Sequence, residues 1–397
     1  MVGRMKILAL SSERALLNDE NSIMNNTLER MKEYSDAADA DFEVIVHSKG
    51  EGFRNVQSGR IAVYPTNRKG PISSYSEMKR IGTALIRKNG ISCIFAQDPF
   101  AYGEIGHMLK KQHGLPLLVN VFSSFFDDPY WKSESLINRV FNETGKRIVR
   151  AADGVRVECE TEKRKMGELG VEPSRVFVSP VLVDLGRFRS VSGAGVRKEH
   201  LGRGFDRIAL YLGRLSKEKD VGTLLRAAKE TWEKDRGILF LIVGSGPEEG
   251  SLKCMAAELG LRNVVFAGRI PYSEVPAYHA AADVFVLPSL YEGIPLVLVE
   301  AHASGKPVVC TELRDAPDVM LNGKSGYVVP QKGYREMAEK IIEILRGGRA
   351  EEMGEAGRAY VLGLYDRKKC LEKFSEVLHS TIASAKAGRK GANASKR

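Results

Sequence analysis

Short apolar runs alternate with helical stretches along nearly the whole chain, and this alternation limits the possible folds more than any other feature of the sequence. Each run has the length of a buried strand and is bounded by polar or glycine-containing turns. Strands that alternate with helices form parallel sheets, because a helix is needed to carry the chain back to the start of the next strand. The sequence therefore predicts an α/β protein with mostly parallel sheets.

The alternation occurs in two similar series, and the second begins near Arg207. In the first series, apolar runs predict strands at residues 6–10, 44–47, 61–64, 93–96, 117–121, 155–157 and 176–178. In the second series, they predict strands at residues 208–211, 239–243, 264–266, 284–287, 308–310 and 327–329.

Helical spacing fills many of the gaps between these strands. Ser74 and Glu77 have the spacing of a capping box, which predicts a helix start there and a stop near Gly90. A helix over 101–113 should end at Gly114. In the second series we predict helices at residues 222–234, 248–259, 274–281, 296–303 and 335–345.

The length of 397 residues, with 43% hydrophobic and 28% charged residues, suits two folded domains. Residues 190–204 are rich in glycine and poor in apolar side chains, which is typical of a linker. We therefore predict two doubly wound, Rossmann-like domains facing each other across a cleft. Their expected bounds are residues 1–190 and 205–360, followed by a helix at 361–383 that packs back on the first domain and a basic disordered tail at 384–397.

The net charge of +10 is divided between this tail and the rest of the chain. The tail supplies five positive charges and no acidic residue, from Lys386, Arg389, Lys390, Lys396 and Arg397. The mildly basic remainder suits anionic partners such as nucleotides, phospholipid surfaces or phosphorylated substrates. Non-specific nucleic-acid binding is an alternative that removal of the tail would test, and we expect no specific nucleic-acid partner.

The sequence argues against several other classes of protein. Its five cysteines are scattered without a Cys-x-x-Cys pair, and its seven histidines lack the spacing of metal ligands, so we expect neither a disulfide framework nor a metal site. No apolar run approaches the roughly 20 residues of a membrane-spanning helix. We therefore expect a cytoplasmic protein, with peripheral contact to the inner face of the cell membrane as a further possibility.

A turn with two cations follows the first strand of the second series. Gly213 lets the backbone approach a ligand closely, and Arg214 and Lys219 can neutralise a diphosphate. The alternative is a charged surface turn.

A second turn carries carboxylates at the start of a helix. Pro295 suits an early helical position, where free N–H groups can bind an anion. Glu292 and Glu300 flank this start, and their oxygens can accept hydrogen bonds from sugar hydroxyl groups. Glu300 lies in an apolar run, so a buried partner is expected.

The pair Gly244 and Gly246 also follows a strand, but the third glycine of a dinucleotide-binding fingerprint is missing. We interpret the pair as a tight turn beside the same pocket.

Together these motifs resemble family 4 retaining glycosyltransferases (group 1) of the GT-B fold. The resemblance is carried by Gly213-Arg214-Leu215, Glu218-Lys219, Val243-Gly244-Ser245-Gly246-Pro247, Ala282-Asp283-Val284-Phe285-Val286-Leu287-Pro288-Ser289, Glu292-Gly293-Ile294-Pro295 and Glu300-Ala301-His302-Ala303-Ser304-Gly305. It covers residues 205–345 strongly and the first half more weakly, through Ala152-Asp153-Gly154-Val155 and Val183-Asp184-Leu185-Gly186-Arg187-Phe188.

The resemblance implies transfer of a sugar from a nucleotide diphosphate-sugar to a glycan or glycolipid acceptor with retention of anomeric configuration. It implies that Arg214, Lys219 and Glu292 act in catalysis and that no cofactor or metal is needed. The donor would be bound by Gly213, Arg214, Lys219, Gly244, Glu292, Gly293, Ile294, Pro295, Leu296 and Glu300. Glu300 would hold the ribose, and Glu292 would face the transferred sugar.

The first half departs from the family at the acceptor side. Phe122 stands where many relatives have a histidine, and Asn120 and Asp127 are the polar residues within range. Ser11 and Ser12 replace the usual glycine pair. These changes motivate an alternative, a catalytically silent sugar-nucleotide- or glycan-binding homologue that acts as a subunit. A GT-B phosphorylase or an epimerase remains an alternative among enzymes.

A cluster of aromatic residues and a basic helix follow Phe122. The aromatic residues could form an apolar lip for a lipid or sugar, or could pack the loop on its domain. The helix, predicted at residues 133–150, could lie at a membrane surface or could face the core with a basic outer side. The sequence leaves both pairs of alternatives open.

Overall fold

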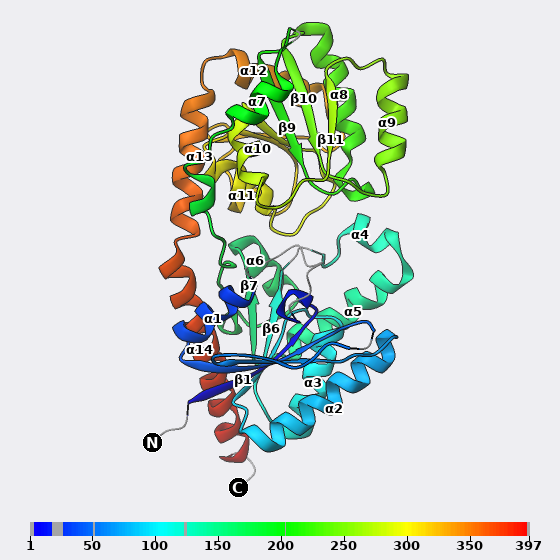
Figure 1. Ribbon diagram of the computed structural model, residues 1–397. Helices are drawn as coiled ribbons and strands as arrows, with labels where there is room; N and C mark the ends of the chain where they lie inside the picture. Colours follow the sequence, from blue (N-terminus) through cyan, green and yellow to red (C-terminus); the bar gives the residue numbers. More distant parts are fainter. Residues whose placement is uncertain (1–3, 18–26, 51, 123–124, 203, 395–397) are drawn as a thin grey trace. The chain divides into compact units, whose positions relative to one another are not determined.

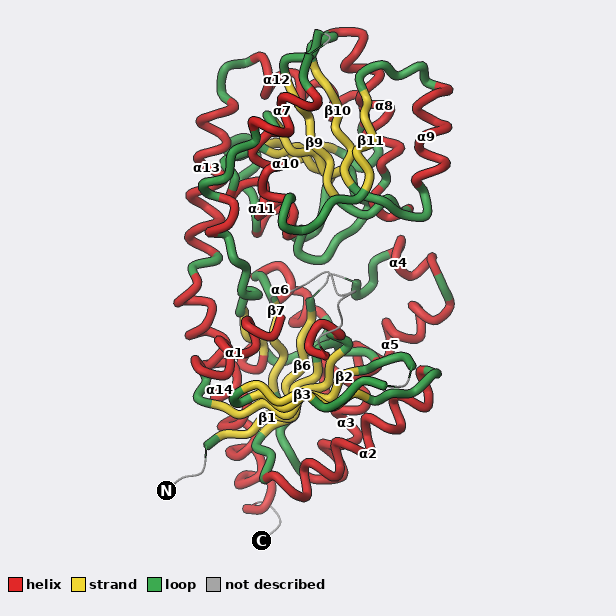
Figure 2. The backbone as a smooth tube through the Cα atoms, in the orientation of Figure 1, coloured by secondary structure: helices red, strands yellow, loops and turns green. Residues whose placement is uncertain are grey.

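The computed structural model describes residues 4–17, 27–50, 52–122, 125–202 and 204–394 (Figure 1). The chain divides into two units, which we describe separately. The N-terminal unit consists of Met1–Leu182 together with Arg367–Arg397, and the C-terminal unit of Val183–Asp366. In each unit, helices cover a central sheet (Figure 2).

The N-terminal unit contains an eight-stranded sheet with the order β3-β4-β2-β1-β5-β6-β7-β8. Its strands are β1 (Met5–Ser11), β2 (Ala40–Val46), β3 (Val56–Ser58), β4 (Ile61–Pro65), β5 (Cys93–Ala96), β6 (Leu117–Val121), β7 (Gly154–Val157) and β8 (Val176–Val178). All neighbouring strands are parallel except β3 and β4, which form an antiparallel pair. The predicted strands are confirmed, and β3 was missed.

Two groups of helices cover the two faces of this sheet. The helices are α1 (Thr27–Ala37), α2 (Pro71–Asn89), α3 (Ala101–His113), α4 (Pro129–Glu134), α5 (Leu136–Ala151), α6 (Glu160–Glu168) and α14 (Arg367–Ala394). Along β1, Leu8 and Leu10 face the core formed with α2, α3 and α5. Ile7 and Ala9 face the core formed with α1 and α14. This alternation follows from the two-residue period of a strand.

Helix α2 begins earlier than its predicted capping box. Its N-cap is Gly70, with Pro71 in the first turn, and it ends at Gly90 in a left-handed conformation as predicted. Ser74 lies inside the helix, where its hydroxyl group contacts Thr66 Oγ1 at 2.6 Å and His47 Nδ1 at 2.7 Å. The capping-box prediction is wrong because a proline at the first helical position provides a helix start without a side-chain cap.

The predicted helix over 133–150 is two helices in the structure. Helix α4 ends at Glu134, and Ser135 takes an extended conformation and caps α5 by accepting a hydrogen bond from the Asn138 N–H at 3.1 Å. Because Ser135 is extended in order to cap α5, α4 and α5 cannot form one continuous helix.

The C-terminal unit contains a six-stranded sheet with the order β11-β10-β9-β12-β13-β14, and all its pairs are parallel. Its strands are β9 (Arg207–Leu212), β10 (Ile238–Val243), β11 (Val264–Gly268), β12 (Val284–Leu287), β13 (Val308–Thr311) and β14 (Gly326–Val329). Its helices are α7 (Ala194–His200), α8 (Val221–Lys234), α9 (Glu249–Glu258), α10 (Val275–Ala281), α11 (Leu296–Ala303), α12 (Tyr334–Arg346) and α13 (Ala350–Leu364). The predicted strands and helices of this unit are confirmed, and α7 and α13 were missed.

The predicted linker at 190–204 is wrong. This segment contains α7 and belongs to the C-terminal unit, which begins at Val183. Arg197 anchors α7, because its guanidinium group donates hydrogen bonds to Ala281 O at 2.7 Å and to Asp283 Oδ2 at 2.9 Å. Gly193 allows the close approach, since a Cβ atom there would lie 2.2 Å from Ala281 N. Its glycine content reflects tight packing rather than a flexible connection.

The C-terminal helix α14 completes the N-terminal unit. Phe374 is 1% exposed and lies against Tyr34 of α1, with ring centroids 4.2 Å apart. The guanidinium group of Arg156, on β7, lies 5.3 Å from the Phe374 ring centroid and 5.8 Å from that of Tyr34. The helix therefore closes one face of the N-terminal sheet.

The expected bounds at this end of the chain need two corrections. The helix that begins at residue 367 follows a separate helix α13, which belongs to the C-terminal unit, so no single element starts at 361. Helix α14 also continues to Ala394, so the prediction of disorder from 384 is wrong for residues 384–394. Alanines at 383, 385 and 387 favour continuation of a helix that is already formed. Residues 395–397 lie outside the described residues.

Among the described residues, no helix combines the length and the apolar character that a crossing of the bilayer requires.

Candidate functional site

The predicted donor residues follow strands that meet at the switch point of the C-terminal sheet. From β9 the chain proceeds outward to β10 and β11, whereas β12, β13 and β14 extend to the other side. Ligands of doubly wound sheets bind beyond the carboxyl ends of the strands at such a reversal. The turn that starts at Gly213 follows β9, and the turn that contains Glu292 follows β12, so the sheet places them next to each other.

Backbone contacts shape the turn after β9. The Tyr211 hydroxyl group donates a hydrogen bond to Arg214 O at 2.8 Å, and the Gly213 N–H donates to Val243 O at 3.0 Å. The Leu215 N–H donates to Ser245 O at 3.0 Å. The turn is therefore packed against the neighbouring turn after β10, while the side chain of Arg214 is exposed.

Gly244 is required by this packing. Its φ angle is +138°, and a Cβ atom there would lie 1.8 Å from Gly213 O. A Cβ atom at Gly246 would lie 2.2 Å from Leu215 O. The glycine pair thus lets two turns approach each other, in line with its interpretation as a tight turn.

Lys219 and Glu292 form an ion pair across the switch point. Lys219 Nζ lies 2.6 Å from Glu292 Oε1 and 2.7 Å from Oε2, and their side chains are 20% and 12% exposed. The Ser289 hydroxyl group donates a hydrogen bond to Glu292 Oε1 at 2.7 Å. The Leu290 N–H donates to Glu218 O at 2.8 Å and ties the two turns together. Two predicted site residues, far apart in sequence, are therefore in direct contact.

The start of α11 differs in detail from the prediction. Pro295 is the N-cap residue, one position before the helix. The Leu296 N–H donates to Ile294 O and the Leu298 N–H to Pro295 O, both at 2.8 Å. The Leu296 N–H, which was expected to assist ligand binding, is therefore already engaged.

Glu300 lies on α11 and is 7% exposed. The Tyr272 hydroxyl group donates a hydrogen bond to Glu300 Oε1 at 3.1 Å, and His279 Nε2 lies 3.8 Å from Glu300 Oε2. Burial, together with the charge and hydrogen bond of Glu300, raises the pKa of Tyr272 to about 12. The partner expected for this carboxylate is therefore a tyrosine.

Arg187 supports Tyr272. Its guanidinium group lies 4.3 Å from the Tyr272 ring centroid and donates a hydrogen bond to Tyr272 O at 3.0 Å. Sequence reasoning missed Tyr272 and Ser289, and it assigned Arg187 to the first domain. Tyr272 follows β11, so inspection of the residues after every strand would have named it as a candidate, but its contact with Glu300 depends on the fold.

The N-terminal sheet has its own switch point, between β1 and β5. The Ser11 hydroxyl group, at the end of β1, donates a hydrogen bond to Gln97 Oε1 at 2.6 Å. Asp98 Oδ1 accepts hydrogen bonds from the N–H groups of Phe100 at 2.7 Å and Tyr102 at 3.2 Å. Burial raises the pKa of Asp98 to about 6, against the effect of these backbone hydrogen bonds. Sequence reasoning noted only Ser11 in this group.

The predicted acceptor-side residues lie in two places. Asn120, near the end of β6, is 2% exposed, and its Oδ1 has no hydrogen-bond partner among the described residues. Phe122 follows β6 and is 39% exposed. Asp127 instead accepts a hydrogen bond from Lys146 Nζ at 2.6 Å, beside Asn142. Burial favours a higher pKa for Asp127, but these two partners hold the pKa below its usual value.

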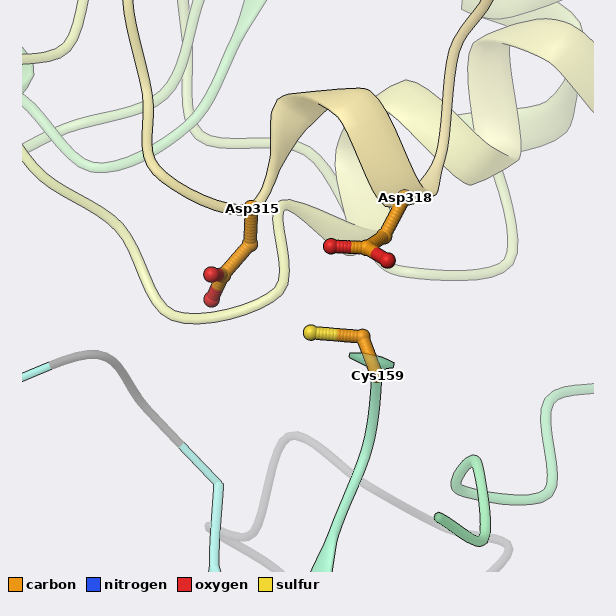
Figure 3. A group of neighbouring side chains, drawn as sticks. All are labelled: Cys159, Asp315 and Asp318. Atoms are coloured by element: carbon orange, nitrogen blue, oxygen red, sulfur yellow. The ribbon is translucent and has the colours of Figure 1, made fainter. Parts of the chain in front are cut away.

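Asp315 precedes a single 3₁₀ turn (Ala316–Asp318) in the C-terminal unit, and Asp318 ends it (Figure 3). Cys159, also drawn there, belongs to the N-terminal unit. Two carboxylates are fewer ligands than a protein metal site usually supplies. Within either unit alone, the described residues bring no three potential metal ligands together.

Comparison with known proteins assigns both halves of the chain. Residues 196–360 match the family model "Glycosyl transferases group 1", and residues 24–181 match "Glycosyl transferase 4-like domain".

Two curated relatives illustrate the similarity. The GDP-mannose-dependent alpha-(1-6)-phosphatidylinositol monomannoside mannosyltransferase of Mycolicibacterium smegmatis is 34% identical over 209 residues, which cover 50% of this chain and 55% of the relative. The D-inositol 3-phosphate glycosyltransferase of Acidothermus cellulolyticus is 29% identical over 278 residues, which cover 66% of this chain and 61% of the relative. The chain thus spans less than two thirds of the length of these relatives.

Solved structures share the fold over almost the whole chain. Sucrose-phosphate synthase from Thermosynechococcus elongatus superposes with a TM-score of 0.79 at 21% identity, covering 95% of this chain and 99% of that one. Anabaena HepE in complex with UDP gives a TM-score of 0.71 at 17% identity, covering 96% of this chain and 100% of that one. The predicted α/β class with two Rossmann-like domains is confirmed, and the chain belongs to the group 1 glycosyltransferases (family 4) of the GT-B fold.

Proposed function

We propose that this protein transfers a sugar from a nucleotide diphosphate-sugar to a hydroxyl group of a glycan or glycolipid acceptor. The observation that carries the proposal is the convergence of Lys219, Glu292 and the Gly213 turn at the switch point of the C-terminal sheet, with Glu300 on the helix that follows. This convergence supplies cations for a diphosphate and carboxylates for sugar hydroxyl groups within one unit.

The cations act on the leaving group. Departure of the sugar leaves a nucleoside diphosphate with additional negative charge, and cations that are already in position stabilise this charge better than water does. Arg214 is exposed and available to a ligand, whereas Lys219 is held by Glu292. Donor binding would transfer Lys219 from Glu292 to the diphosphate and leave Glu292 free to accept hydrogen bonds from the sugar. These two cations would supply the charge that a divalent metal supplies elsewhere, so we propose that catalysis needs no metal.

Glu300 would bind the nucleoside part of the donor. Its oxygens can accept hydrogen bonds from both ribose hydroxyl groups, and Tyr272 restricts the orientation of the carboxylate. Gly244 would serve indirectly, because it lets the turn that carries Arg214 take its position. Gly293, Ile294 and Pro295 form the connection between Glu292 and α11.

The acceptor would bind at the carboxyl end of the N-terminal sheet. Ser11, Gln97 and Asp98 lie at its switch point. Asn120 Oδ1, which has no hydrogen-bond partner among the described residues, lies near the end of β6. These groups suit a ligand rich in hydroxyl groups. The relatives named above act, by their names, on a phosphatidylinositol mannoside and on an inositol phosphate, which are ligands of this kind. The anomeric configuration would be retained, and NMR of the product would test this.

The test is donor turnover by purified protein. A panel that begins with GDP-mannose and UDP-glucose is screened by thermal shift, because a ligand that binds only the folded state raises the melting temperature. The stabilising donor is then used in hydrolysis and transfer assays with and without EDTA. Arg214→Ala should lower turnover by about 10²–10³-fold, the usual cost of removing one group that stabilises developing charge. Lys229→Ala, an exposed change in the middle of α8, is the matched control.

The alternative is a silent homologue that binds a donor or a glycan without turnover. It is favoured by Phe122, which stands at the position of a family histidine and is partly exposed. Donor binding without hydrolysis or transfer, for every donor and for a range of sugar acceptors, would support it and contradict catalysis.

A further inference from the structure

Three large apolar side chains are exposed together at the start of α5. Leu136 is 75% exposed, Ile137 is 62% exposed and Val140 is 63% exposed. Single exposed apolar residues are common on proteins and need no explanation, but a contiguous group indicates a surface that binds something. We call these three residues the α5 patch.

The three side chains share one side of the helix. At 100° per residue, positions 136, 137 and 140 lie within one arc of about 100°. The other half of the helix is different, since Ile148 and Val149 are fully buried in the core of the N-terminal unit. Of the two alternatives left open by the sequence, the core-facing helix therefore describes only the second half of α5.

Aromatic side chains pack α4 and α5 against the rest of the N-terminal unit. Phe100 stacks on Trp131 of α4 and on Phe141 of α5, with centroid distances of 5.5 Å in both cases. Gly145 permits this arrangement, because a Cβ atom there would lie 2.7 Å from Phe126 and 2.9 Å from Phe100. Phe125, Phe126 and Trp131 are thus occupied in packing. The side chains of the patch, by contrast, stay largely exposed in the part of the chain that the structure describes.

Basic residues outnumber acidic residues on α4 and α5 taken together. Helices α4 and α5 carry Lys132, Arg139, Lys146, Arg147 and Arg150, against two acidic residues, Glu134 and Glu143. Arg139 Nε donates a hydrogen bond to the backbone carbonyl of Lys132 at 3.3 Å, which places the Arg139 side chain against the end of α4 next to the patch. In the second half of α5, Lys146 is paired with Asp127 and Glu143, and Arg147 is paired with Glu104, so these charges compensate one another. The basic residues next to the patch are Lys132 and Arg139. An apolar surface with a basic border is complementary to an anionic bilayer.

We propose that α4 and the first half of α5 bind the surface of an anionic lipid bilayer. Leu136, Ile137 and Val140 would enter the interface between headgroups and acyl chains, while Lys132 and Arg139 would contact the lipid phosphates. Three side chains give weak binding, so it is reversible and depends on the basic residues. Attachment is therefore sensitive to salt.

The location of the patch agrees with a lipid-borne acceptor, and this point alone rests on the proposed function. Helix α5 returns the chain from the end of β6 to the start of β7. Its first turns therefore lie at the carboxyl end of the N-terminal sheet, the end that carries the proposed acceptor residues. A surface that attaches here presents lipid headgroups to that end of the unit.

The test is sedimentation of the full chain with vesicles of phosphatidylcholine alone and of phosphatidylcholine mixed with phosphatidylglycerol. The parent protein should bind the mixed vesicles and be released by salt. The combined change Leu136→Ser, Ile137→Ser and Val140→Ser should weaken this binding by about 10-fold or more, through lost apolar burial. Ile72→Ser is the matched control, because Ile72 is 85% exposed at the start of α2, outside the patch, and its loss should have no effect.

The outcomes separate the possibilities. A parent protein that ignores mixed vesicles, or a triple variant that binds them as well as the parent does, overturns the proposal. If light scattering shows that the parent is a dimer, and the triple variant a monomer with unchanged vesicle binding, the patch joins two copies instead. Thermal unfolding and donor hydrolysis without vesicles check that the variants are folded. If the triple variant loses vesicle binding but hydrolyses the donor normally, the result supports the role of the patch in membrane binding. If the parent protein binds vesicles but hydrolyses no donor, the result contradicts only the proposed function.

Discussion

Three charged residues of the proposed donor site, Lys219, Glu292 and Glu300, already have partners before any ligand binds. Lys219 Nζ contacts both oxygens of Glu292, and the Tyr272 hydroxyl group contacts Glu300. Neither carboxylate is left buried without a hydrogen-bond donor, which would be costly. A ligand must therefore exchange these contacts for its own, and donor affinity is the difference between the two sets.

Tyr272→Phe tests whether the orientation of Glu300 matters. The change removes one hydrogen bond and keeps the ring that contacts Arg187. We expect KM for the donor to rise about fivefold, which corresponds to about 1 kcal/mol, with little change in kcat, because the carboxylate loses a positioning contact rather than a reacting group. Tyr334→Phe, at the start of α12, is a control. A fall in kcat with unchanged KM would contradict this role.

Asp98 makes stability depend on pH. Burial raises its pKa from 3.8 to about 6, so the folded chain holds this proton more tightly than the unfolded chain does. Its contribution to the free energy of unfolding is therefore fully present below pH 3.8 and is lost as the pH rises through about 6. Asp98→Asn keeps a hydrogen-bond acceptor but cannot titrate.

We expect the variant to gain stability relative to the parent above pH 6 and to lose this advantage as the pH falls towards 3.8. Chemical denaturation of both proteins across this range measures the difference. A difference that does not change with pH would show that Asp98 titrates at its ordinary value in the folded chain.

At the same scale, sequence reasoning found the residues that stand in recognisable motifs. It identified Lys219, Glu292 and Glu300, and the structure joins the first two directly. It missed Tyr272 because nothing in the sequence shows that the loop after β11 reaches α11. Such contacts depend on strand order, which the alternation of strands and helices does not specify.

For helices and strands, the sequence was most informative where burial decides the structure. The strands of the C-terminal sheet agree with prediction to within one or two residues, because fully buried parallel strands are continuous apolar runs. The errors lie where local contacts decide. Helix α2 begins at Pro71 rather than at the predicted capping box, and Ser135 divides a predicted helix into α4 and α5. The predicted linker contains α7, which Arg197 anchors by hydrogen bonds.

Helix α13 packs closely against α11, and this contact predicts the effect of a substitution in α13. Gly357 of α13 faces His302 of α11, and a Cβ atom would lie 2.2 Å from His302 Nδ1. His302 is fully buried, and this burial lowers its pKa to about 4, so the ring is neutral at physiological pH and occupies a tight site.

Gly357→Ala should destabilise the C-terminal unit by about 1–3 kcal/mol, because a buried ring has to move. Gly363→Ala, in the same helix, meets nothing within 4 Å and should be neutral or stabilising by up to about 1 kcal/mol. Hydrogen exchange of peptides from the C-terminal unit compares the two variants. Equal exchange in both would show that the contact tolerates a methyl group.

On the scale of the whole molecule, the N-terminal unit is assembled from both ends of the chain. Sequence composition predicted two domains and a helix that returns to the first, but it placed the boundary at the glycine-rich segment 190–204 instead of at Leu182 and Val183. Composition could not distinguish tightly packed glycines from flexible ones, since that difference depends on what lies around them.

Phe374→Ala should therefore weaken a unit whose strands lie hundreds of residues earlier in the sequence. Loss of a buried aromatic side chain costs about 3–5 kcal/mol. Hydrogen exchange should accelerate in peptides from β1, β2 and β5 and remain unchanged in β9 to β14. Lys373→Ala, an exposed neighbour on α14, should have no effect. Faster exchange confined to α14 itself would show that the sheet is stable without this helix.

Because α14 belongs to the N-terminal unit, this unit can be completed only at the end of translation. A ribosome releases β1 to β8 first, yet the apolar face that Phe374 covers stays open to water until translation has passed the entire C-terminal unit. During that interval the second sheet can fold on its own residues, while the first waits for its last helix with a hydrophobic surface that chaperones recognise. A nonsense codon between Asp366 and Phe374 would leave a product whose defect lies in its earliest-made half.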